Sequence, residues 1–161
     1  CSNKCGAMTE LDSIDKQILA IIQKDARISN RALAHKIGLT ASPTIERVKR
    51  LEREGVIRGY RAVIDKPSVE KGLSIFVKVT LSVHQMSLLD EFTKSIESIP
   101  HILACYHTTG QGDFLLHVVA RDMADYEHLL REKLTSLPDI ERLETTMVLR
   151  TIKEDGALPI T

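Results

Sequence analysis

The stretch ASPTIERVKRLER, residues 41–53, carries hydroxyl and basic groups whose spacing suits recognition of a polyanion. Short hydroxyls near a helix start can bond phosphates or base edges, and an arginine can contact guanine in bidentate fashion or bind a phosphate. If Ile45, Val48 and Leu51 face a core, the polar groups lie on the opposite side or its flanks. We expect DNA contacts from six side chains of the stretch: Ser42, Thr44, Arg47, Lys49, Arg50 and Arg53.

The same stretch also fits a helix that merely faces water. Glu46 and Arg50 stand four residues apart, and such pairs stabilise an exposed helix by ~0.2–0.5 kcal/mol each. Pairs of this kind would account for the charges without any binding partner. The stretch alone does not decide between the two interpretations, but its flanking segments favour DNA.

Two further helices are predicted before this stretch. Asp12 is a capping residue ahead of a helical period of isoleucines in residues 14–22. A short helix follows between Ser29, a second capping residue, and Gly38, where a left-handed residue would end it. Only residues 39–41 separate it from the next helix, which is the spacing of a helix-turn-helix motif. In that motif the second helix enters the major groove with its N-terminus first.

The segment after the third helix adds two more candidate phosphate contacts. Residues 56–65, VIRGYRAVID, alternate in polarity, which predicts a wing or connecting strand that carries Arg58 and Arg61. The charge distribution agrees, since residues 9–64 hold 11 basic against 7 acidic residues, whereas residues 65–161 hold 10 against 15. A basic first third on an acidic remainder suggests separate partners for the two parts.

The remainder of the chain alternates between strand and helix patterns. We predict strands at residues 73–83, 101–109, 113–120 and 145–153, and helices at 87–99 and 122–137. The order strand, helix, strand, strand, helix, strand is that of a ferredoxin-like βαββαβ sandwich. Two helices cover only one face of such a sheet, yet Leu115 and Val119 alternate with the equally apolar Leu116 and Val118. An uncovered apolar face predicts an obligate dimer at least.

Several other classes of protein are disfavoured by composition. No run approaches the ~18 apolar residues of a membrane helix, so we expect a cytoplasmic protein. Two of the three cysteines lie within residues 1–8, which we interpret as an expression remnant, and Cys105 alone cannot build a disulfide framework or a cysteine zinc site. GQGDFL lacks the third glycine and the following helix of a dinucleotide-binding fingerprint. We expect no cofactor and no resident metal.

The chain from about Leu11 to Ile160 resembles the Lrp/AsnC, or feast/famine, transcriptional regulators. The resemblance is carried by LDSIDKQIL, by GLTASPTIERVKRLEREGVIRGYRAVID and by ACYHTTGQGDFLLHVVARDMADYEHLL, in the order typical of that family. It implies a winged helix-turn-helix joined to a ferredoxin-like sensing domain, dimers built partly by exchange of the connecting strand, and assembly to tetramers or octamers. The implied domains are a helix-turn-helix at 9–56, a connecting strand or hinge at 57–72, and an effector-binding and oligomerisation domain at 73–161.

The resemblance also implies that an amino acid or similar metabolite binds near the hairpin TGQGDF. Backbone N–H groups around the two glycines could cradle a carboxylate, and Asp113 could accept from an ammonium group. The alternative is that Gly-Gln-Gly only makes a tight turn, with Asp113 as turn chemistry. Gly112 departs from the family, which more often has a bulkier residue there. The expected effector-binding residues are Gly110, Gln111, Gly112, Asp113 and, more weakly, Thr146.

An enzyme is the second hypothesis. Some proteins similar to this family decarboxylate a haem precursor with histidines of the ferredoxin-like half. We expect His101 and His107 on adjacent strand surfaces near Cys105, where a Cys-x-His on one face could support metal or thiol chemistry. The alternation of a strand alone would place Cys105 and His107 on one face, because residues two apart on any strand share a face. A sensing module without DNA binding is a third possibility. The basic residues of the third helix favour a regulator that is not an enzyme.

Overall fold

The computed structural model describes residues 10–82, 86–154 and 156–160. The expected expression remnant, residues 1–8, lies outside this part of the chain. The described residues form two compact units, one from residues up to Ala62 together with those from Lys153 onward, and the other within Val63–Ile152. The C-terminal residues therefore group with the helical unit, although the sequence placed them in the second domain.

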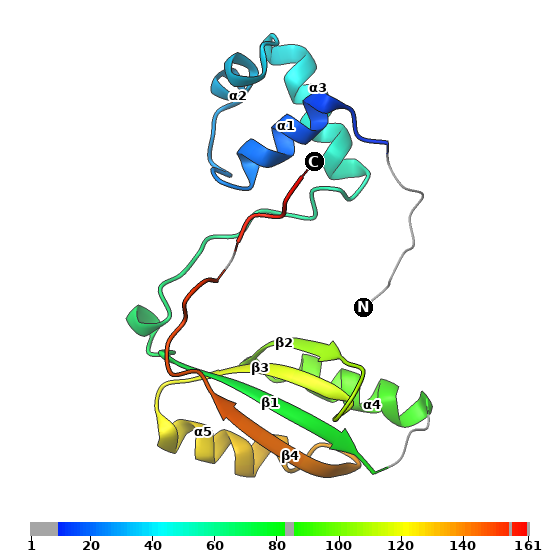
Figure 1. Cartoon of the computed structure of the whole chain (residues 1–161), viewed down its shortest axis with the longest axis vertical. Helices are drawn as coiled ribbons and strands as arrows, with labels where there is room; N and C mark the ends of the chain where they lie inside the picture. The colour runs from blue at the N-terminus through cyan, green and yellow to red at the C-terminus, as the bar shows by residue number, and fades with distance from the viewer. Residues whose placement is uncertain (1–9, 83–85, 155, 161) are drawn as a thin grey trace. The chain divides into compact units, whose positions relative to one another are not determined.

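Three helices build the first unit, α1 (Ser13–Ile22), α2 (Asn30–Ile37) and α3 (Ala41–Arg53) (Figure 1). Asp12 and Asp15 form a capping box at the start of α1, which satisfies two backbone donors that the helix leaves unpaired. Ser29 accepts from the backbone of Ala32 at the start of α2, and Gly38 ends that helix with φ 71°. These local signals confirm the predicted order of helices.

The helices enclose a small apolar core. Ile18 of α1, Leu33 of α2 and Leu51 of α3 are almost fully buried within it. The chain's last described residue, Ile160, packs against the same cluster. Gln23 holds this tail through both amide atoms, since Leu158 N donates to Gln23 Oε1 at 2.6 Å and Gln23 Nε2 donates to Leu158 O at 3.3 Å.

The predicted wing or connecting strand does not form within the single chain. Residues 58–65 carry no helix or strand, and they pair with no strand in the described part of the chain. Val63 and Ile64, the apolar residues that suggested a strand, are 83% and 58% exposed. Alternating polarity marks a segment able to pair, but a strand also needs a neighbour to bond with.

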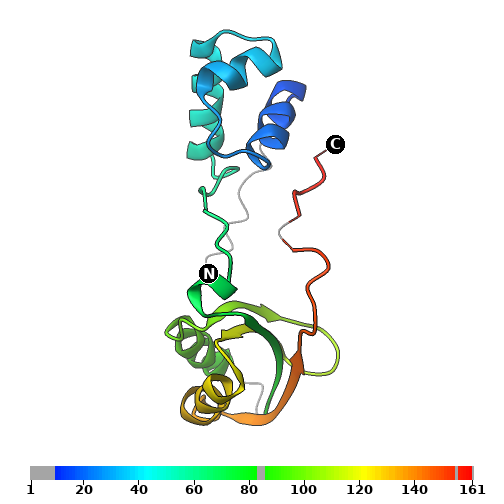
Figure 2. The same ribbon diagram turned by 90° about the vertical axis from the view of Figure 1, so that its left-hand side faces the viewer.

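The second unit is a four-stranded antiparallel sheet in the order β2-β3-β1-β4. Its order along the chain confirms the ferredoxin-like prediction, and α4 and α5 lie on the same face of the sheet (Figures 1 and 2). A π-helical turn at Leu130–Leu134 continues α5. The bounds are β1 Leu73–Leu81, α4 Met86–Glu97, β2 Ile102–His107, β3 Phe114–Ala120, α5 Met123–Leu129 and β4 Ile140–Met147.

The last strand begins earlier than residue 145, where it was predicted. The register of β1 with β4 shifts between Thr80 and Leu81, because Thr80 pairs with Arg142 and Leu81 with Ile140. Such a bulge inserts one unpaired residue and breaks the period of two. Ile140 and Leu143 both pack against the core although they are three residues apart. The first part of the strand therefore lacks the alternation by which strands are predicted.

The two faces of the sheet differ in what covers them. Ile75, Val77, Leu116 and Val118 are fully buried beneath the helices. The open face combines apolar and polar side chains, including Phe76, Leu115 and Tyr106 beside Ser74, Lys78 and His117. His117 stacks on Phe76, with ring centroids 4.9 Å apart, and its Nε2 lies 2.6 Å from Ser74 Oγ.

Candidate nucleic-acid interface and ligand site

Two of the arginines expected to contact DNA are bonded to α1. Arg47 Nη1 donates to Asp12 Oδ2 at 2.6 Å and to Asp15 Oδ1 at 2.8 Å, and Arg50 Nη2 pairs with Asp15 Oδ2. The side chain of Asp15 is only 1% exposed, whereas Arg47 and Arg50 are 30% and 35% exposed. A carboxylate this deeply buried needs cationic partners. Both arginines therefore hold the third helix against the first.

The electrostatics of Asp12 follow from the same arrangement. Its bond from the Asp15 backbone and the adjacent Arg47 guanidinium lower the pKa of the Asp12 carboxyl below its usual value. The hydrogen bonds to Asp12 and Asp15 in turn raise the pKa of Arg47. Both groups are thus charged at neutral pH, so the contact is an ion pair.

The predicted DNA contact of Thr44 is wrong. Thr44 is fully buried, and its Oγ1 donates to Thr40 O at 2.9 Å. It occupies the inner face of α3 together with Leu51, while Ile45, which was expected on that face, is only partly buried. A hydroxyl bonded to the carbonyl four residues earlier can lie on a buried face without leaving a polar group unpaired.

Replacing Thr44 with valine tests this correction. The variant keeps the shape of the side chain and loses the bond to Thr40, so we expect the free energy of unfolding to fall by about 1 kcal/mol. Urea denaturation would measure the loss. Affinity of the folded variant for DNA should stay within twofold of the parent; a tenfold loss with no change in stability would restore Thr44 as a DNA contact.

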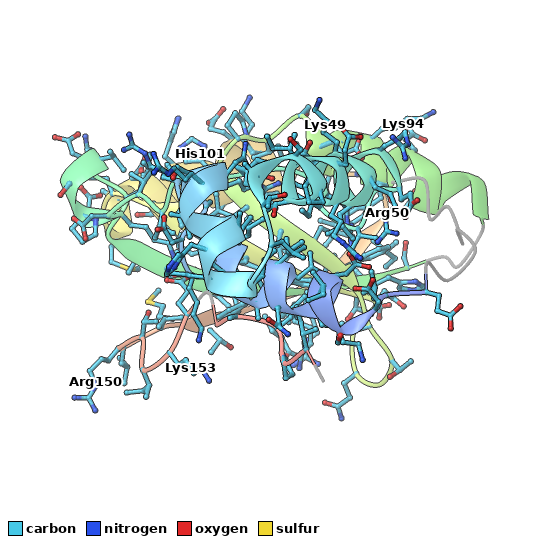
Figure 3. The ribbon with its side chains drawn as sticks, turned by 90° about the horizontal axis from the view of Figure 1, so that it is seen from above. Lys49, Arg50, Lys94, His101, Arg150 and Lys153 are labelled. Carbon is cyan, nitrogen blue, oxygen red and sulfur yellow. The ribbon has the colours of Figure 1, made fainter. Side chains whose placement is uncertain are left out.

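The outer side of α3 is exposed and basic. Ser42, Lys49 and Arg53 are exposed there, and in the described part of the chain no hydrogen bond or ion pair joins them to another side chain. Figure 3 shows Lys49 and Arg50 on different sides of the helix. Arg58 and Arg61, beyond the helix, are exposed as well. Five of the eight expected DNA contacts are therefore accessible to a ligand.

The β2–β3 hairpin has the backbone that the glycines were expected to provide. Gly110 and Gly112 adopt φ of 105° and 89°, values that favour glycine strongly over other residues. A Cβ on Gly112 would stand 2.5 Å from Cγ of Lys78. The bulkier residue more usual in the family would therefore need the Lys78 side chain to move.

Asp113 stabilises the turn through three hydrogen bonds. Its Oδ2 accepts from Leu81 N at 2.8 Å, while its backbone N donates to Val79 O and its backbone O accepts from Thr108 N. These bonds tie the hairpin to the end of β1, as the alternative interpretation expected. Gln111 is exposed at the tip.

Thr146 is not brought to the hairpin within one chain. It lies opposite Phe76 on β1, whereas Asp113 bonds Val79, three residues further along that strand. At ~3.3 Å per residue the two positions are separated by roughly 10 Å along the strand. A ligand at the hairpin would reach Thr146 only if it extended across the sheet.

The two histidines do not form one site. His101 precedes β2 and His107 ends it, so the two stand at opposite ends of one strand, not on adjacent surfaces, about 20 Å apart at ~3.3 Å per residue. Burial raises the pKa of the Cys105 thiol to about 11, which leaves it mostly un-ionised and unreactive near neutral pH. Among the described residues no cluster of three potential ligands could hold a metal ion.

The sequence did not anticipate a hollow of about 280 Å³ on the helix side of the second unit. It lies between the end of α4 and α5, with His101, Asp125 and His128 in its lining. Lys71 Nζ stands 3.2 Å from His101 Nε2 and 3.5 Å from Asp125 Oδ2. No periodic pattern could have found it, because its lining comes from two separate segments, residues 98–101 and 125–133.

Fold and site together define a DNA-binding transcription factor with a small-molecule domain. A winged helix-turn-helix DNA-binding domain matches residues 11–58, and an Lrp/AsnC ligand binding domain matches residues 74–158. The chain belongs to the Lrp/AsnC family of transcriptional regulators, and its expected fold and DNA-binding function are confirmed. No helix among the described residues has the length and apolar character needed to cross a bilayer.

Relatives of known role agree. The chain is 37% identical to the Bkd operon transcriptional regulator of Pseudomonas aeruginosa, over 95% of this chain and all of that one. It is 36% identical to the leucine-responsive regulatory protein of Escherichia coli K12, over 94% and 92% of the two chains. Both are named as regulators, and the decarboxylase hypothesis gains no support from them.

Two solved structures resemble most of the chain. The complex of a Neisseria meningitidis transcriptional regulator with L-Met superimposes with a TM-score of 0.89 at 31% identity, over 93% of this chain and 97% of that one. An AsnC family regulator from Agrobacterium tumefaciens gives a TM-score of 0.88 at 29% identity, over 92% and 97%.

Proposed function

We propose that this regulator binds DNA through the outer side of α3 and responds to an amino acid or similar metabolite at the β2–β3 hairpin. The exposed basic groups on the outer side of α3 and just beyond it support the DNA-binding part of the proposal. Asp15 fixes Arg47 and Arg50, so the DNA-facing group is reduced to Ser42, Lys49, Arg53, Arg58 and Arg61. As chromosomal DNA is its target, we place the protein in the cytoplasm.

The ligand is proposed to carry both a carboxylate and an ammonium group. Left-handed glycines at 110 and 112 present backbone N–H groups at an exposed turn, and such groups favour a carboxylate. Asp113 lies beside them with a negative charge that suits an ammonium. The complex of the Neisseria regulator with L-Met supports an amino acid.

Assembly is the third part of the proposal. The open face of the sheet bears Phe76, Leu115 and the 55%-exposed Tyr106, which a second copy would cover. Dimers would place two recognition helices on two half-sites, as helix-turn-helix proteins require. Ligand would act through different affinities for alternative assemblies, tetramers or octamers included.

A thermal-shift screen of the twenty amino acids tests the ligand class. A ligand at ~100 times its dissociation constant adds ~2.7 kcal/mol of stability, so at least one amino acid should raise the melting temperature by several degrees. In the variant Asp113→Asn, which can still accept from Leu81 N, that shift should be lost while the ligand-free melting temperature changes little.

The matched control is Glu132→Gln, which removes one exposed carboxylate from the same unit and should keep the full shift. Absence of any shift with all twenty amino acids would reject the ligand class. An unchanged shift in Asp113→Asn would remove Asp113 from the site.

A further inference from the structure

The outer side of α3 includes one carboxylate among its basic groups. Ser42, Glu46, Lys49 and Arg53 recur at spacings of four, three and four residues and are all exposed, so they form one stripe along the helix. The stripe lies opposite Thr44 and Leu51, the buried residues of α3. We call these four residues the outer stripe. Glu46 stands in the second turn, between Ser42 and Lys49.

Glu46 does not pair with Arg50, the basic residue four positions later in the sequence. Arg50 pairs instead with Asp15 of α1. In the described part of the chain Glu46 has no hydrogen bond or ion pair, whereas Glu52, on the same helix, accepts from Tyr60 Oη at 2.8 Å. The helix fold therefore gives no account of this carboxylate.

An unpaired carboxylate on a surface that meets phosphates opposes binding through simple electrostatics. Base contacts can offset this repulsion, because Glu46 lies in the N-terminal turns, the part of a recognition helix that reaches base edges. A carboxylate there can accept from the N4 amino group of cytosine, the one base-edge contact that acidic side chains make well in the major groove. Lys49 and Arg53, nearer the end of the helix, are placed for phosphates.

We propose that Glu46 determines specificity for a cytosine in each half-site by accepting a hydrogen bond from cytosine N4. The inference depends on the outer stripe being the surface that faces DNA. It gives the carboxylate two opposed effects: weaker binding to DNA of any sequence, and selective binding where a cytosine stands opposite. Loss of the charge should therefore raise the affinity for DNA of any sequence and lower the selectivity for cytosine.

Selection of binding sites from random duplexes by the full-length protein tests this inference. We expect sites from the parent to hold one invariant cytosine per half-site. Glu46→Gln should select adenine or no preferred base there, since glutamine pairs with adenine, while the other positions stay fixed. On a parent site, preference for cytosine over other bases at that position should fall about 10-fold or more. Affinity for unrelated DNA should rise.

Two control variants separate the possible failures. Glu54→Gln removes the same charge from the opposite end of α3 and should leave the selected sites unchanged. Lys49→Ala should weaken all duplexes alike and reduce the salt dependence of binding. Identical sites for Glu46→Gln and the parent would overturn the role of Glu46 alone. Unchanged affinity in Lys49→Ala would overturn the outer stripe as the DNA-facing surface, and the inference with it.

Discussion

Replacing Asp15 with alanine is expected to lower the free energy of unfolding of the helical unit by about 3 kcal/mol. Removing one partner of a buried ion pair costs ~3–5 kcal/mol, because the remaining charge is left uncompensated. Asp15 has two such partners, Arg47 and Arg50, and also accepts from Asp12 N in the capping box. The lower end of the range applies, since both arginines are about a third exposed and can turn toward water.

Urea denaturation followed by circular dichroism would measure the effect. Asp12→Ala is the matched control, because the Asp12 side chain is 49% exposed and loss of a cap costs ~1 kcal/mol. Equal midpoints for the two variants would contradict the view that the buried carboxylate fastens α3. Freed arginines should also increase affinity for unrelated DNA at low salt, which an electrophoretic mobility assay would detect.

The helices of the first unit were predictable because the residues that cap them act locally. Asp12, Ser29 and Gly38 begin and end helices through bonds to their own neighbours, which a short window of sequence contains. The pairing of Asp15 with two arginines more than thirty residues away is long-range. One signal was present: Asp15 shares a helix face with Ile18, Leu19 and Ile22, so a carboxylate on that face required a cation.

The same distinction explains the errors about α3. Periodicity placed Ile45 with Val48 and Leu51, because it counts only apolar residues. Thr44 takes the buried position instead, since its hydroxyl can bond the carbonyl of Thr40. With the inner face rotated by one residue, Arg47 moves toward the core and the outer stripe becomes the exposed side.

In the second unit the sheet order was predictable from the alternation of elements, but the function of the hairpin was not. The sequence of the turn contained both interpretations, glycines as a cradle and glycines as a tight turn. The structure shows the turn: Asp113 bonds the backbone of Leu81, and Gly110 and Gly112 have positive φ. The proposed ligand cradle would use the residues that also make the turn.

Introducing a charge on the open face, by Leu115→Glu, is expected to raise the dissociation constant of the proposed assembly by at least about 100-fold. An unpaired carboxylate at a covered surface costs several kcal/mol, and each 1.4 kcal/mol is tenfold in the dissociation constant. The protomer should stay folded, because Leu115 lies on the open face of the sheet and is only partly buried in the single chain. Light scattering coupled to size exclusion would report the mass of the parent and of the variant.

Met123→Glu provides the matched control, since Met123 is 52% exposed and begins α5 on the helix side of the sheet. It adds the same charge to the same unit, at a helix N-terminus that favours negative groups, and should leave the assembly intact. Because two half-sites are read together only by an oligomer, Leu115→Glu should also lose cooperative binding to paired sites while each half-site is still bound. A variant that keeps the parental mass would show that copies associate through another surface, and the exposed Val63 and Ile64 of the connecting segment would then be the next surface to test.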